Sequence, residues 1–303
     1  MSSRRIAARL EALEKRRISE DTGAGAIVEA VDTTNTLLTG IDTVLDSIEA
    51  QDTAGLNISA GRITGTSAVH KFGANLAIPN SFTPVTRGGV YPMVLAAAAT
   101  TLRIKAGGNA ADTAAGAGAR EITLQGLDET GAEVSEAVAT AGASASSSTT
   151  ATFIRVYRAW VSASGTYATP AGGSHVADIV IEDTAGTQDW GTIPFNGFGM
   201  AQSTIAAYTV PLGKTAYMQS WLLQVDSNKT VDFMFYVREN ILESAAPFSA
   251  YRMKFGAFGV SDNISVKPHT PAGPFPALTD LVWMAKVATG TGIAAADFEL
   301  IIE

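Results

Sequence analysis

The feature that most constrains this chain is a change in the spacing of its apolar residues. Between residues 27 and 48 they recur at alternating steps of four and three, whereas beyond residue 100 they recur at steps of two. Steps of four and three place residues on one side of an α-helix, and steps of two place them on one face of a β-strand. The chain is therefore expected to combine an N-terminal helical region with a larger, mainly β body.

The helical spacing over residues 27–50 forms a heptad seam of about three repeats. Within the heptad, position a is mostly leucine and position d is mostly isoleucine, a combination that favours trimers or tetramers over dimers. We therefore predict a coiled-coil stalk that makes the protein a homo-oligomer, with a trimer as the expected state. The alternative is an amphipathic helix that packs on its own domain, since Gly40 weakens such a helix by about 1 kcal/mol relative to alanine. The predicted oligomer interface comprises Ile27, Val31, Leu38, Ile41, Leu45 and Ile48.

The first 20 residues are predicted to form a basic helix. Residues 1–17 contain six bases and two acids, a net charge of +4, which leaves −12 for the remainder because the whole chain carries −8. An acidic remainder argues against nucleic acid as a specific partner. We predict that this helix docks the chain on an acidic partner surface; the alternative is a solvated helix. The predicted anchor residues are Arg4, Arg5, Arg9, Lys15, Arg16 and Arg17.

Residues 101–303 are predicted to form a jelly-roll-like β-sandwich. Apolar and polar residues alternate over 217–225 and over 231–238, and turn residues such as Asp226–Asn228 separate the alternating stretches. Many short alternating strands with regular turns are typical of sandwiches and jelly rolls.

Two other stretches carry weaker signals. Residues 51–100 contain scattered proline and glycine and are expected to connect the stalk to the body, with short strands at 56–63. Residues 141–152 are rich in Ser, Thr and Ala and are expected to form a long surface loop.

No residue pattern of an enzyme or a metal site is found. The chain has no cysteine, which excludes a disulfide framework and cysteine-based zinc sites. His70, His175 and His269 lack metal-type spacing and are expected in loops or on the surface. We therefore predict no catalytic residue, no metal, no cofactor and no enzymatic activity, with a glycan-cleaving enzyme as a remote alternative.

Two further observations concern localisation and ligands. The N-terminus lacks an apolar signal-peptide core, and the most apolar stretch is too short to span a bilayer, so neither export nor a membrane partner is expected. The aromatic residues either line a sugar-binding face or pack in the core or between subunits. The four tryptophans among them are Trp160, Trp190, Trp221 and Trp283.

A succession of short segments carries a resemblance to a known group. The segments are His70–Asn75, Ala111–Arg120, Gln125–Asp128, Val134–Val138, Tyr208–Tyr217, Thr279–Leu281 and Phe298–Ile301. From about residue 65 to the C-terminus this succession resembles virion structural proteins of tailed bacteriophages, many of them marine. The matching segments are turns and strands, so they indicate the group rather than a particular role. The region before residue 65 departs from what the group shares.

The resemblance implies an accessory virion protein that is assembled in the host cytoplasm and carried in the virion. The leading interpretation is a non-enzymatic capsid decoration or head-fibre protein, oligomerised through residues 27–50 and docked on other virion proteins through its basic N-terminus. The alternative is a tail- or baseplate-associated attachment protein that binds a receptor or glycan on the host surface.

Overall fold

A computed structural model describes residues 3–18, 31–43, 54–88, 99–166, 173–195, 200–226, 228–268 and 270–303. The chain divides into two compact units, Met1–Thr66 and Ser67–Glu303, here called unit 1 and unit 2. The protein is mainly β, as the sequence predicts, and all its paired strands are antiparallel in the described part of the chain.

Unit 1 is helical where it is described. It contains α1 (Ser3–Ile18), a helical stretch over residues 31–43 and the short helix α3 (Ala54–Ser59). The prediction of short strands at 56–63 is wrong. The backbone N–H of Ala60 donates to the carbonyl of Leu56, and Gly61, with a φ of 67°, closes the turn as a left-handed C-terminal residue.

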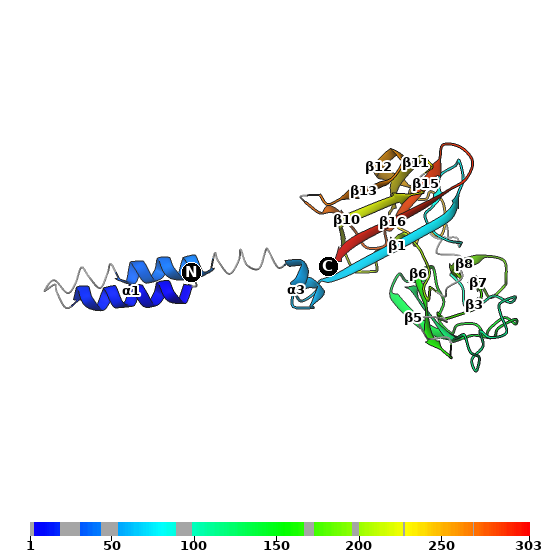
Figure 1. The fold of residues 1–303 in the computed structure, drawn as a ribbon, viewed down its shortest axis with the longest axis horizontal. Coiled ribbons are helices and arrows are strands. Elements are labelled where there is room, and N and C mark those ends of the chain that lie inside the picture. The colour runs from blue at the N-terminus through cyan, green and yellow to red at the C-terminus, as the bar shows by residue number, and fades with distance from the viewer. Residues whose placement is uncertain are drawn as a thin grey trace. The chain divides into compact units, whose positions relative to one another are not determined.

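Unit 2 contains a large sandwich of two five-stranded sheets (Figure 1). Phe235 of one sheet meets Phe298 of the other at 6.4 Å between ring centroids, and Trp283 meets Trp221 at 6.1 Å. Apolar side chains of both sheets therefore share one core. The first sheet comprises β1 (Ser67–Ile78), β16 (Gly292–Ile302), β10 (Ala216–Val225), β13 (Asn263–Val266) and β14 (Ala272–Phe275). The second comprises β12 (Arg252–Val260), β11 (Val231–Arg238), β15 (Asp280–Val287), β2 (Thr83–Pro84) and β9 (Ala207–Thr209).

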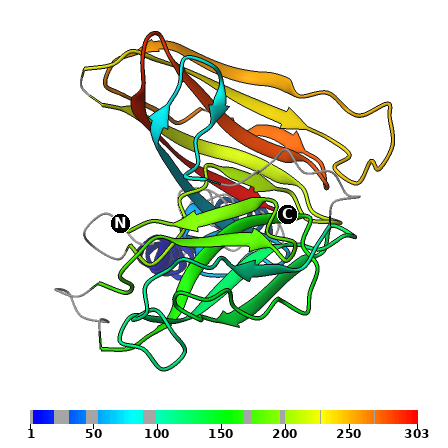
Figure 2. The ribbon, with the colours of Figure 1, turned by 90° about the vertical axis from the view of Figure 1, so that its right-hand side faces the viewer.

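A small sandwich lies in the sequence between β2 and β9 and has a second core of its own, which includes Leu102, Ile122, Phe153 and Ile181. Figure 2 shows its green strands gathered on one side of unit 2. One sheet comprises β3 (Leu102–Ile104), β7 (Ile179–Asp183) and β8 (Asp189–Ile193). The other comprises β5 (Glu133–Ala139), β4 (Ala119–Leu127) and β6 (Arg155–Ser164).

The described body thus differs from a single sandwich over 101–303. Its first strand, β1, lies in the segment expected to be a connector and pairs with β16 along nearly its whole length. The sequence signal for β1 is weak because two of its buried positions are Lys71 and Gly73. Gly73 leaves no room for a side chain, since an added Cβ would lie 1.9 Å from the backbone nitrogen of Ala206.

The Ser/Thr-rich segment 141–152 contains no helix or strand, as expected of a loop, but it is hydrogen-bonded along β3. The N–H of Ser146 donates to the carbonyl of Ile104, and the Ser146 hydroxyl accepts the N–H of Ile104 at 2.8 Å. Thr149 and Leu102 make the same reciprocal pair of bonds. The segment therefore satisfies the open edge of β3 with backbone and hydroxyl groups, a role that requires short polar side chains.

The two cores are joined by a fully buried ion pair. Arg155 on β6 donates from Nε and Nη2 to the two carboxylate oxygens of Asp280 on β15, both at 2.9 Å, and neither side chain is exposed. The Thr209 hydroxyl donates to the same carboxylate at 2.7 Å. Gly126 lets β4 approach this site, because an added Cβ would lie 1.8 Å from the carbonyl oxygen of Arg155.

Replacing Asp280 by asparagine is expected to lower the free energy of unfolding by about 3–5 kcal/mol, because it leaves the Arg155 guanidinium buried without its counter-charge. Urea denaturation followed by tryptophan fluorescence measures this loss. The matched control is Glu239→Gln, which removes a carboxylate that pairs with Arg252 on the surface and should cost at most about 1 kcal/mol. Equal losses in the two variants would contradict the assigned importance of the buried pair.

Candidate interaction surfaces

The six predicted anchor bases all lie in α1. Arg5, Arg9 and Arg16 are separated by four and seven residues, so their positions fall on one side of the helix. The side chain of Arg9 is exposed, whereas those of Arg4, Arg5, Lys15, Arg16 and Arg17 lie outside the described part of the chain. The backbone therefore supports a basic stripe, and its docking role stays a prediction.

The predicted oligomer seam is partly described. Val31 and Leu38 are half-buried, while Ile41 is 55 % exposed. Ile27, Leu45 and Ile48 lie outside the described residues. An apolar row on this helix is therefore incompletely covered within one chain.

The opposite side of the same helix is polar and internally satisfied. The hydroxyls of Thr36, Thr39 and Thr43 donate to the carbonyls four residues earlier, at 2.8–2.9 Å. Threonine can be held in a helix in this way without any external partner. The helix thus has one side that needs no partner and one apolar side that does.

Unit 2 uses its buried histidine and aspartate for structure. His175 lies in the loop before β7, as expected, but it is fully buried rather than on the surface, and its ring contacts the hydroxyl of Ser174 and the carbonyl of Pro194. Burial lowers its pKa, although the charge of Asp112 opposes the shift, so the ring is neutral near pH 7. Asp112 accepts backbone N–H groups from Ala119, Val176 and Ala177.

The other two histidines lie on the surface or outside the described residues. His70 on β1 is exposed and contacts Asp297 at 2.5 Å, and His269 lies outside the described residues. No group of three or more His, Cys, Asp or Glu side chains that could hold a metal ion occurs in the part of the chain that is described. Within the same part, no helix is long and apolar enough to cross a membrane.

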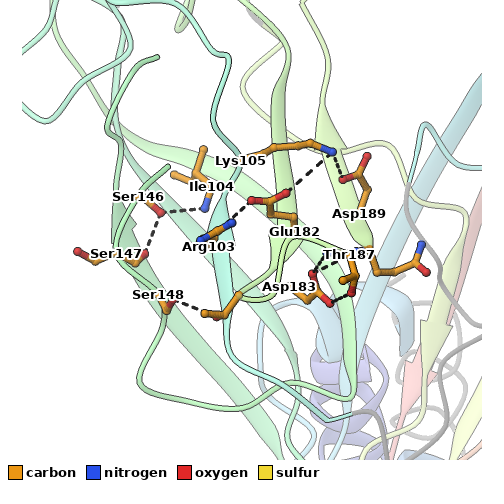
Figure 3. A network of polar contacts seen from close by, with 12 residues as sticks. Arg103, Ile104, Lys105, Ser146, Ser147, Ser148, Glu182, Asp183, Thr187 and Asp189 are labelled. Carbon is orange, nitrogen blue, oxygen red and sulfur yellow. Dashed lines mark hydrogen bonds and ion pairs between the residues drawn. The ribbon is translucent and has the colours of Figure 1, made fainter. Parts of the chain in front are cut away.

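A network of ion pairs ties three strands of the small sandwich together (Figure 3). Arg103 donates to Glu182 at 2.8 Å, and Lys105 lies 2.7 Å from Asp189 and 3.9 Å from Glu182. The three strands β3, β7 and β8 each contribute to it.

The four tryptophans occupy different environments. Trp190 and Trp283 are buried in the small and the large core respectively. Trp221 stacks on Phe255 at 4.9 Å. Trp160 alone lies on a solvent-facing side of a sheet, since its strand neighbours Ala159 and Val161 belong to the core.

Lys71 is a buried lysine of unit 2 with a lowered pKa. Its amine is buried, donates a hydrogen bond to the carbonyl of Tyr157 and lies 5.5 Å from the centre of the Tyr157 ring. Burial first, and then the positive charge of Arg158, lower the pKa of Lys71 to about 7. Sequence reasoning missed this residue because a lysine in a strand normally marks a solvent-facing position.

Comparisons with known proteins give no relative: no protein-family model, no curated protein and no solved structure matches this chain. The function proposed below therefore rests on the sequence and on the geometry described here.

Replacing Lys71 by methionine is expected to flatten the pH dependence of stability between about pH 10 and pH 7. In this range the unfolded chain holds a proton on Lys71 and the folded chain releases it, so the stability due to this site falls by about 1.4 kcal/mol per pH unit as pH decreases. Lys71→Met removes that loss, and its advantage over wild type should grow toward pH 7. Urea titrations at several pH values measure the difference.

The matched control is Lys254→Met on β12, where the lysine is exposed. This control should track wild type at every pH. A constant difference between Lys71→Met and wild type across the range would contradict a lowered pKa for Lys71.

Proposed function

We propose that this protein is a non-enzymatic structural component of a bacteriophage virion, acting as a capsid decoration or head-fibre protein. In this proposal the helical region over residues 27–50 holds a homotrimer together, and α1 attaches the trimer to other virion proteins. The body is proposed to have a jelly-roll-like architecture. The resemblance over residues 65–303 supports the virion context.

The observation that carries the proposal is a contrast between the two units. Unit 2 contains two apolar cores, whereas no described side chain of unit 1 is buried. Isolated helices of about a dozen residues are marginal in water, so most helices are stabilised by packing. A helix with an exposed apolar row, and with no buried side chain among the described residues of its unit, is suited to association with copies of itself.

The charge of α1 supports attachment rather than oligomerisation. Arg5, Arg9 and Arg16 share one side of the helix, and like charges facing each other across a trimer would be unfavourable. The same stripe complements an acidic surface.

The described part of unit 2 supports a non-enzymatic role. Its buried charges are engaged in hydrogen bonds that hold strands together, as in Arg155–Asp280 and Asp112. Titratable groups that are fully used by structure have little capacity for proton transfer to a ligand.

The alternative of a host-attachment protein is favoured by one observation, the solvent-facing Trp160. Exposed aromatic side chains on a sheet are typical of ligand contact. This alternative places the same trimer on the tail or baseplate, and gold labelling of intact virions with an antibody to unit 2 distinguishes tail from head.

Two acidic substitutions in the seam are expected to dissociate the trimer. Leu38→Glu with Ile41→Glu places charges in the apolar row, whereas the control Thr36→Glu with Thr43→Glu places the same charges on the polar side. Light scattering after size exclusion should give one 31.4 kDa chain for the seam variant and three for the control and wild type. A wild-type monomer, or a seam variant that stays trimeric, would contradict the proposed association.

Charge reversal in α1 is expected to prevent loading onto virions. Arg5→Glu with Arg9→Glu reverses two charges of the stripe, and Arg252→Glu with Lys254→Glu reverses two charges of β12 as a matched control. Quantitative immunoblots of purified virions should show loss of the α1 variant and normal loading of the control. Equal loading of the α1 variant and the β12 control would contradict the proposal that α1 is the anchor.

A further inference from the structure

The outer face of the β5–β4–β6 sheet presents one aromatic ring among hydrogen-bonding side chains. Thr123 on β4 lies directly opposite Trp160 on β6, and Gln202 pairs with Trp160 from the other side. Directly opposite residues share a face of a sheet. Thr123, Trp160 and Gln202 therefore form a row across neighbouring strands.

A second row runs beside the first. Gln125 on β4 lies opposite Arg158 on β6 and opposite Ser135 on β5. With strands about 4.8 Å apart, the two rows span roughly 10–14 Å. We call this surface the platform; its members are Thr123, Gln125, Ser135, Arg158, Trp160 and Gln202.

The platform is open and polar apart from its ring. Gln202, Arg158 and Ser135 are exposed, and Trp160 is partly exposed. Amide, hydroxyl and guanidinium groups together supply both donors and acceptors. A flat row of such groups around an indole matches a sugar, which offers apolar C–H groups on its ring face and hydroxyls around its edge.

The charge of the platform favours an acidic sugar over a neutral one. The guanidinium of Arg158 lies 5.0 Å from the centre of the Trp160 ring and, among the described residues, has no carboxylate partner. Its positive charge also helps to lower the pKa of the buried Lys71. The nearby Glu133 is engaged by the hydroxyl of Tyr157 at 2.9 Å, and Glu121 accepts a hydrogen bond from Ser162 at 2.8 Å. An uncompensated guanidinium beside an aromatic ring complements a carboxylate.

We propose that the platform binds an acidic saccharide, with a sugar ring against Trp160 and a uronate carboxylate on Arg158. The neighbouring Gln125, Thr123 and Gln202 then hydrogen-bond the sugar hydroxyls. The site is a single-ring contact on a flat sheet, so weak binding by each chain is expected, with a Kd of about 0.1–1 mM. Association of several chains would raise the apparent affinity for a polysaccharide without new contacts. The inference holds wherever the protein sits on a particle.

The test uses the full chain labelled with 5-fluorotryptophan, which gives one ¹⁹F resonance for each of the four tryptophans. Trp160→Phe identifies the Trp160 resonance. Hexamers of galacturonate and of mannuronate are titrated separately, and neutral maltohexaose is the control ligand. At least one uronate hexamer should shift the Trp160 resonance selectively, while maltohexaose should bind about tenfold more weakly or not at all.

A matched pair of variants tests the charge. Arg158→Gln keeps hydrogen-bonding groups but removes the cation, and Lys254→Gln removes an exposed cation from β12. Arg158→Gln should weaken uronate binding about tenfold or more, and Lys254→Gln should leave it unchanged. Unshifted resonances of Trp190, Trp221 and Trp283 in the free variants verify that their folds are intact.

Three results would overturn the proposal. They are no selective shift of the Trp160 resonance by either uronate hexamer, equal binding of maltohexaose, and equal binding by Arg158→Gln and Lys254→Gln. The seam and α1 variants above leave the platform unchanged, so failure of this test is distinguishable from failure of the proposed virion role.

Discussion

The buried ion pair between Arg155 and Asp280 is the interaction on which the arrangement of unit 2 depends. Two charges without solvent are tolerated only if each is fully engaged, because removing them from water costs several kcal/mol per ion. Here both carboxylate oxygens receive a guanidinium N–H, and Thr209 adds a further donor. The two strands that carry the pair belong to different sandwiches, so the small sandwich can pack on the large one only in the register that completes these bonds.

The surroundings of the pair extend the same constraint. Arg238 lies opposite Asp280 in the β11–β15 ladder and 5.9 Å from the ring centre of Tyr251. Burial first, and then the negative charge of Asp280, raise the pKa of Tyr251 to about 12, so its hydroxyl stays neutral. The charges near the junction of the two cores therefore belong to one connected set. This set favours one position of the two sandwiches relative to each other.

The two units differ in how far their described side chains are buried and hydrogen-bonded. Unit 2 engages many of its polar groups internally: the Ser/Thr-rich segment completes the edge of β3, and Asp112 accepts three backbone N–H groups. Unit 1 has no buried side chain in its described part, and apolar side chains such as Ile41 are exposed there. This contrast is the basis of the proposed attachment and self-association through unit 1. The platform around Trp160 is the surface of unit 2 that is proposed to bind a ligand.

The sequence by itself determined the mainly β class, the positions of β10 and β11, and the helices at the N-terminus, because these follow from the local periodicity of apolar residues. It could not reveal β1, because the buried positions of that strand include a lysine and a glycine. Nor could it reveal the two separate cores, because the sheet that a strand joins depends on its pairing with strands far away in the chain. It also could not separate Trp160 from the other three tryptophans, since all four lie in alternating strands or beside them. Only the tertiary structure decided these points: whether a side chain is buried, paired or open to solvent depends on its partners across the sheets, and those partners come from distant parts of the chain.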